Sequence, residues 1–89
     1  MMDPYMLKNE AMLREGKAML ARKAAAMSGP APAFSILARK RKLMEVEARY
    51  SEVSRRFEQL RAAGTEGIAD LKVGLEKAWE AFRFEIGWK

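Results

Sequence analysis

Three carboxylates near the end of the chain are the residues whose spacing comes closest to that of a metal site. Glu76 and Glu80 are one helical turn apart, and Asp70 precedes them. Carboxylates on one helix face can bind divalent metals, but such helical sites usually add histidine, and the chain has none. It also has no cysteine, so it lacks thiolate ligands. Without histidine, no serine can have a histidine that activates it as a nucleophile. The sequence therefore predicts a solvated acidic face, no metal or other cofactor, and no enzymatic activity.

A run of four cations, from Arg39 to Lys42, is the second group that could bind a ligand. Such cations could contact the phosphates of nucleic acid or of an anionic lipid surface. Four successive helical residues point around most of a helix, so the alternative is that they are solvated side chains. The first interpretation assigns anion binding to Arg39, Lys40, Arg41, Lys42, Arg49, Arg55 and Arg56.

The composition is that of one small helical domain covering residues 1–89. Charged residues make up 33% and aromatic residues 9%, which is typical of long helices and coiled coils. The net charge of +5 is concentrated in residues 35–61, which carry eight basic and four acidic side chains. We find neither a secretory signal pattern nor an apolar run of the roughly 20 residues that span a bilayer, which predicts a cytoplasmic protein.

The elements that position these side chains begin with a helix over about 4–27. Asp3 and Pro4 favour a helix start, and pairs of apolar residues follow one heptad apart. This apolar stripe is imperfect, because Asn9, Gly16 and Lys23 occupy the second seam position of successive heptads. The stretch 28–34, SGPAPAF, predicts a loop, since glycine suits a helix end and proline prevents its continuation.

A second helix is predicted over about 35–86. Its seam has two positions per heptad, with only Arg39 out of place. The residues at these positions are Ile36, Leu43, Tyr50 and Phe57, and Val46, Val53 and Leu60. The apolar face then continues in phase through Gly64 to Ile86, which favours one long helix. A break at 64–66 is the alternative, because Gly64 and Thr65 could end one helix and start another.

The lengths of the two helices predict a self-associating helical hairpin. At 1.5 Å per residue the first helix spans roughly 36 Å and a continuous second helix roughly 76 Å, so half of the second would lie bare. A second copy could cover it, with Gly67 and Gly74 allowing close approach. The predicted oligomer interface comprises Gly67, Ile68, Leu71, Gly74, Leu75, Ala78, Trp79 and Phe82. With a break at 64–66, the chain would instead form a monomeric three-helix bundle.

Two aromatic residues near the C-terminus, Phe84 and Trp88, do not fit the helix face of Trp79, Phe82 and Ile86, and they indicate a partner. The sequence thus predicts an all-α coiled-coil module that binds itself, as a dimer or higher oligomer, and an unidentified protein. The alternative function is a basic helical module that binds nucleic acid or an anionic membrane surface.

The stretch 50–82 resembles a class of small bacterial coiled-coil proteins, some of them associated with stress responses. Their C-terminal pattern reads A-A-G, then D-L-K-x-G-x-E-x-A-W. The matching residues are Ala63, Gly64, Asp70, Leu71, Lys72, Gly74, Glu76, Ala78 and Trp79. The chain departs from the pattern at Gly67-Ile68, where these proteins carry a tryptophan. The resemblance covers about a third of the chain and implies a helical hairpin or extended coiled coil without established chemistry or catalytic residues.

Overall fold

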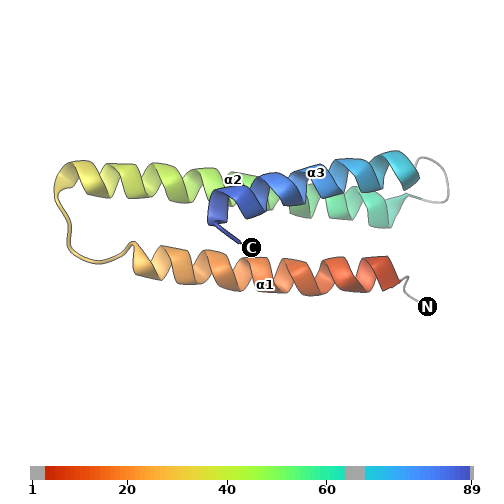
Figure 1. The fold of residues 1–89 in the computed structure, drawn as a ribbon, viewed down its shortest axis with the longest axis horizontal. Helices are drawn as coiled ribbons and strands as arrows, with labels where there is room; N and C mark the ends of the chain where they lie inside the picture. Colours follow the sequence, from red (N-terminus) through yellow and green to blue (C-terminus); the bar gives the residue numbers. More distant parts are fainter. Residues whose placement is uncertain (1–3, 64–67, 89) are drawn as a thin grey trace.

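Three helices and no strand make up residues 4–63 and 68–88, which are the residues described by the computed structural model. They are α1 (Pro4–Ala26), α2 (Ala33–Ala62) and α3 (Ile68–Ile86). Figure 1 shows α1 and α2 as an antiparallel hairpin, with α3 running back along the C-terminal half of α2. The resulting rod measures 52 × 21 × 20 Å. The expected all-α hairpin with a long second helix is confirmed, and that second helix has 30 residues.

The predicted continuous helix over 35–86 is wrong. Helix α2 ends at Ala62, Ala63 has the extended angles φ −72° and ψ 144°, and the chain is helical again from Ile68. Helix α3 packs mainly on α2 of the same chain, so its apolar face is buried without a second copy. Burial within one chain avoids the entropy cost of association, which is the physical reason that the alternative three-helix arrangement forms. The break expected at 64–66 itself lies outside the described residues.

The connection between α1 and α2 is held by Arg39, the residue that interrupts the heptad seam. Its Nη1 donates hydrogen bonds to the backbone oxygens of Met27, at 3.3 Å, and Gly29, at 3.1 Å. Carbonyls at the end of a helix lack partners within the helix, and a cation there is favourable. Arg39 therefore fastens the loop that closes the hairpin.

The core lies between α2 and α3 and is covered by α1. Its buried hydrophobic members are Val46, Val53, Phe57, Leu60, Leu75, Ala78, Trp79, Phe82 and Ile86. The burial predicted for the α2 seam from Val53 to Leu60 is confirmed, and Tyr50 is half-buried. The Tyr50 hydroxyl donates a hydrogen bond to the backbone oxygen of Leu13, at 2.9 Å, which ties α1 to α2.

Two of the three irregular positions of the α1 stripe, Asn9 and Gly16, are the buried residues of this helix. Gly16 faces aromatic rings, and a Cβ at this position would lie 3.1 Å from Phe82 Cε2 and 3.3 Å from Tyr50 Cε1. Asn9 is 3% exposed, and its side-chain oxygen accepts a 2.7 Å hydrogen bond from Trp79 Nε1. The polar and small residues that weaken the heptad pattern thus let α1 approach the aromatic part of α3.

Candidate interaction surfaces

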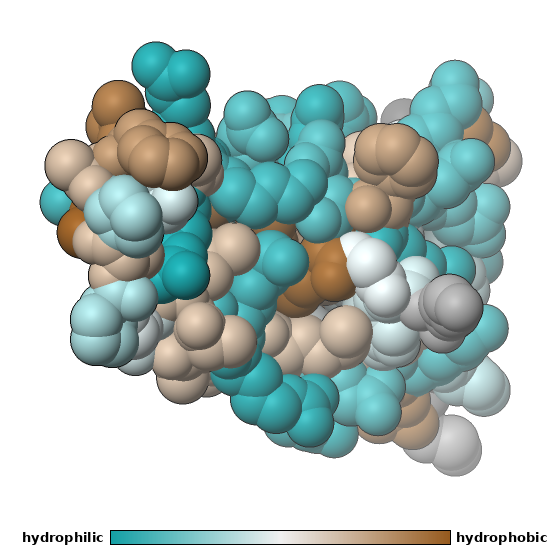
Figure 2. Space-filling view, turned by 60° about the vertical axis from the view of Figure 1, so that its left-hand side comes forward, coloured by the Kyte–Doolittle hydropathy of each residue, from teal (hydrophilic) through white to brown (hydrophobic). Residues whose placement is uncertain are grey.

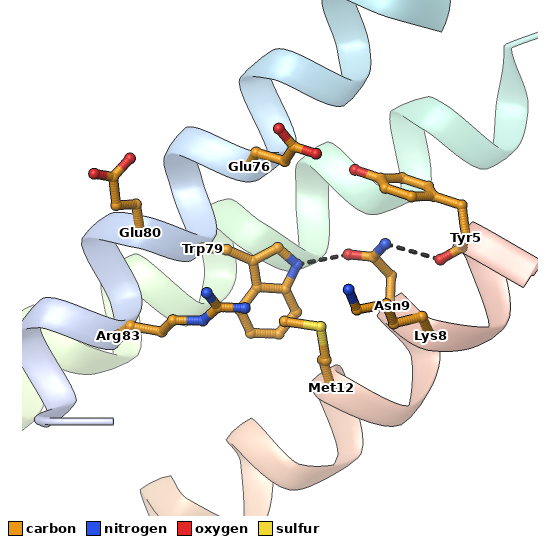
Figure 3. A pocket seen from close by; sticks show the side chains of 8 residues that line it. All are labelled: Tyr5, Lys8, Asn9, Met12, Glu76, Trp79, Glu80 and Arg83. Atoms are coloured by element: carbon orange, nitrogen blue, oxygen red, sulfur yellow. Dashed lines mark hydrogen bonds between the residues drawn. The ribbon is translucent and has the colours of Figure 1, made fainter. Parts of the chain in front are cut away.

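A shallow groove of about 350 Å³ between α1 and α3 is the first place where catalytic or ligand chemistry could occur. Figure 3 shows Asn9 between Trp79 and Tyr5, with its amide nitrogen donating to the Tyr5 backbone oxygen at 2.9 Å. Burial and the nearby Glu76 carboxylate raise the pKa of the Tyr5 hydroxyl above its ordinary value. The central amide and indole are thus engaged with each other, so the groove is a helix contact with a polar centre.

The three carboxylates do not form a metal site. Asp70, Glu76 and Glu80 are exposed, and no group of three or more acidic residues that could hold a metal ion occurs within residues 4–63 and 68–88. Their exposure agrees with the solvated acidic face that the sequence predicts.

Most of the candidate anion-binding cations contact acceptors of the chain itself. Lys42 forms a 2.7 Å ion pair with Glu85, which lowers the pKa of that carboxyl through the hydrogen bond from the ammonium. Arg55 and Arg56 share the carboxylate of Glu52 and lower its pKa in the same way. With Arg39 on the loop carbonyls, four of the seven predicted residues are engaged, whereas Lys40, Arg41 and Arg49 are exposed. The structure therefore does not bring the seven together into one patch.

The predicted oligomer interface falls mostly inside the folded chain. Leu75, Ala78, Trp79 and Phe82 are buried by α1 and α2, and Ile68 and Leu71 pack partly against the same core. Gly67 lies outside the described residues. The premise that a second copy must cover these side chains no longer holds, so self-association has to use another surface and stays a prediction.

The glycine expected at a backbone contact, Gly74, faces a side chain of the same chain. A Cβ there would lie 3.0 Å from Arg56 Nη1, the flexible end of an arginine on α2. The close approach that we expected between two copies therefore occurs at this position between α3 and α2.

A second stripe on α3 points away from the core, and we call it the α3 outer face. It consists of Val73, Lys77, Glu80 and Phe84, all exposed. Val73 is 51% exposed and Phe84 is 85% exposed. Phe84 is thus uncovered, as the sequence indicated, whereas Trp88 packs edge-on against Trp79 with ring centroids 6.0 Å apart. The signal for this face was its spacing of four, three and four residues, which is a coiled-coil spacing.

A corresponding stripe lies on α2, and we call it the α2 outer stripe. Its apolar members are Phe34, Leu37 and Met44, which are 77%, 57% and 68% exposed, and Lys40 and Arg41 lie between them in sequence. Figure 2 turns this end of the molecule forward and shows brown and pale residues gathered there beside teal ones. These three apolar residues have no clear signal in the sequence, because Phe34 belongs to the stretch SGPAPAF that predicts a loop and the other two lie off the seam.

Comparison with known proteins adds no relative. No family model, curated protein or solved structure matches the chain. The resemblance to small bacterial coiled-coil proteins therefore stays a prediction from the sequence. No helix among the described residues is long and apolar enough to cross a membrane.

Proposed function

We propose that the chain is a non-enzymatic helical module that self-associates through the α3 outer face. The observation that carries this proposal is Phe84, which is 85% exposed on a helix whose opposite face is fully packed. Covering a phenylalanine and a valine stabilises a complex by about 1.5–3 kcal/mol for each side chain that becomes fully buried. The absence of histidine and cysteine from the sequence supports the non-enzymatic part, and a cytoplasmic location stays a prediction.

The order of residues along the α3 outer face supports a second copy as the partner. In the arrangement that we propose, two α3 helices pack antiparallel through their outer faces. The twofold axis between them lies at the level midway between Ala78 and Trp79 along the helix. Phe84 of one copy then faces Val73 of the other, and Lys77 faces Glu80. Symmetry repeats both contacts, so one stripe supplies two apolar pairs and two ion pairs.

The charge of α3 also favours pairing with itself. Its acidic residues are Asp70, Glu76, Glu80 and Glu85, and its basic residues are Lys72, Lys77 and Arg83. With opposite charges nearly balanced, two copies of the helix do not strongly repel each other. A single helix pair buries less area than the ~1,200–2,000 Å² of a stable complex, so we expect a reversible dimer that dissociates on dilution.

Light scattering of the intact chain over a dilution series tests this proposal. The wild-type protein is expected to approach a two-chain mass at high concentration, and Phe84→Ser is expected to stay at a one-chain mass. The matched control is Phe34→Ser, which removes an equally exposed ring from α2 and should retain the dimer. A one-chain mass for the wild type at every concentration would refute the proposal.

Charge reversal sharpens the test of the register. Lys77→Glu places like charges opposite each other in the antiparallel pair, and so does Glu80→Lys, so each should weaken the dimer. Combining both substitutions restores opposite charges and should restore the dimer. Circular dichroism of each variant separates this effect from loss of helix. Failure of the double variant to recover the two-chain mass would exclude this pairing.

A further inference from the structure

The two ends of the rod differ because α3 is shorter than α2. Helix α3 has 19 residues and ends at Ile86, next to the ion pair between Lys42 and Glu85. Beyond this point the helices that the structure describes are α1 and α2 alone, as Figure 1 shows. We call residues 17–42 the basic arm.

Every charged residue of the basic arm is a cation. They are Lys17, Arg22, Lys23, Arg39, Lys40, Arg41 and Lys42. The nearest acidic residues in sequence, Glu15 and Glu45, lie on either side of this segment. Lys42 is paired with Glu85 of α3, and Arg39 donates to loop carbonyls, so the exposed cations of the arm on α2 are Lys40 and Arg41, which an anionic surface would attract.

The α2 outer stripe gives the basic arm an exposed apolar line between two cations. Leu37 and Met44 are seven residues apart, so they lie almost on one line along the helix, with Phe34 one turn before Leu37. Lys40 and Arg41 are displaced by about 50° to opposite sides of that line at 100° per residue. This arrangement, with apolar side chains flanked by long cationic ones, is typical of helices that lie in a lipid interface.

We propose that the basic arm docks on the surface of an anionic lipid bilayer. Phe34 and Leu37 enter the boundary between head groups and acyl chains, and Lys40 and Arg41 bind lipid phosphates on either side of Leu37, whereas Met44 lies just beyond the arm beside Glu45. The opposite face of α2 keeps its contacts with the core, so docking requires no unfolding. This function is independent of self-association through α3.

The other anionic or apolar partners fit the basic arm less well. Nucleic acid would neutralise the cations, but its phosphate backbone would leave Phe34 and Leu37 in water. A second copy of the arm would cover the apolar side chains, but it would bring Lys40 and Arg41 of one copy against the same cations of the other. A bilayer of anionic lipid satisfies both the charge and the apolar side chains, and its soft surface accommodates a convex helix face.

Flotation of the full chain with lipid vesicles tests the proposal. We expect binding to vesicles of phosphatidylcholine containing phosphatidylglycerol, little binding to phosphatidylcholine alone, and weaker binding at higher salt. Lys40→Gln with Arg41→Gln should weaken binding roughly thirty-fold, since each cation near an anionic surface contributes about fivefold. Phe34→Ser with Leu37→Ser should weaken it about tenfold or more.

Matched controls locate the binding surface. Lys8→Gln with Arg14→Gln removes the same net charge from exposed positions outside the arm and outside the α3 outer face, and it should weaken binding less than the arm pair. Leu7→Ser removes an exposed apolar side chain from α1 and should leave vesicle binding unchanged. Equal losses from the arm and control variants would overturn the assignment to the arm.

Two further outcomes would overturn the proposal while leaving self-association open. Failure to float with anionic vesicles at low salt would exclude bilayer docking. Binding to a short DNA duplex that competes with vesicles and is insensitive to Phe34→Ser would identify the arm as a nucleic-acid surface. Self-association is measured separately by light scattering. A protein that binds anionic vesicles but stays at a one-chain mass would refute self-association and leave bilayer docking standing.

Discussion

Phe34 and Phe84 are chemically identical and almost equally exposed, at 77% and 85%, yet their surroundings differ. Phe84 lies on α3 between charges of both signs, whereas Phe34 lies on an arm whose charges are all positive. The apolar side chain supplies the tendency to be covered, and the neighbouring charges select what covers it. This difference in charge is why we propose a second copy as the partner of Phe84 and an anionic surface as the partner of Phe34.

Substitution of a buried phenylalanine should have the largest effect on the free energy of unfolding. The effect of substituting an exposed phenylalanine can then be compared with it. Phe57 is 2% exposed in the core, so Phe57→Ala should lower the free energy of unfolding by about 3–5 kcal/mol. Phe84→Ala, made on an exposed ring, should change it by no more than about 0.5 kcal/mol in the monomer. Urea denaturation at low protein concentration measures both values. Similar losses for the two variants would show that Phe84 packs within the fold.

Removal of the hydrogen bond between Trp79 and Asn9 should lower the free energy of unfolding by an intermediate amount. It should leave the basic arm unchanged. Asn9→Ala leaves the buried indole N–H without its acceptor and should cost about 1–3 kcal/mol of unfolding free energy. Trp79→Phe with Asn9→Ala should cost less than the two single losses added together, because the first change already removes the donor. Vesicle binding by the folded variant should be unaffected, and a loss there would link the basic arm to the α1–α3 contact.

The ion pair between Lys42 and Glu85 joins the basic arm to α3. Its removal should have the smallest effect on the free energy of unfolding. Because Lys42 lowers the pKa of Glu85 below its ordinary value of 4.5, this pair stabilises the fold above that value. The contribution is lost as the pH falls through the lower folded-state pKa. The difference in urea midpoint between the wild type and Glu85→Gln should therefore be present at neutral pH and disappear in acid.

Glu85→Gln also tests how the charges of the arm act. The substitution leaves Lys42 without its carboxylate, but at 100° per residue Lys42 lies about 150° around α2 from the line of Leu37 and Met44, so the binding to anionic vesicles should rise by much less than the roughly fivefold expected for a cation at the lipid surface. A gain of about fivefold would mean that Lys42 faces the lipid. Because Glu85 is not in the α3 outer face, the dimer should persist.

Heptad spacing predicted the buried residues of the C-terminal half of α2, but not that the seam residue Ile36 is 42% exposed, nor where the chain reverses. Val53, Phe57 and Leu60 occupy the predicted core positions. Ile68 stays in phase with them because helical periodicity has no direction, and an antiparallel α3 facing the same core has the same apolar spacing. Periodicity alone therefore favoured one helix where the chain forms two.

The candidate surfaces were harder to predict because each helix carries more than one apolar line. Leu37 and Met44 lie opposite the seam of α2, so neither stands out once the seam has been found. Phe84 was recognised as unplaced, but its relation to Val73 requires knowing that the other face of α3 is already covered. Asn9 and Gly16 carried no signal of their roles, since both depend on aromatic residues that lie 34 to 70 positions away in sequence.

Disulfide trapping between unlike variants tests the central claim, the antiparallel pairing of two α3 outer faces. The chain has no cysteine, so Val73→Cys and Phe84→Cys each introduce a single thiol. Two cysteines can be bridged only when their Cα atoms lie within about 7 Å, whereas positions 73 and 84 are separated by roughly 16 Å along one helix. Oxidation of the mixed variants should yield mainly the unlike disulfide-linked dimer, and each variant alone should cross-link little. Preferential cross-linking of like variants, or none in the mixture, would contradict the account.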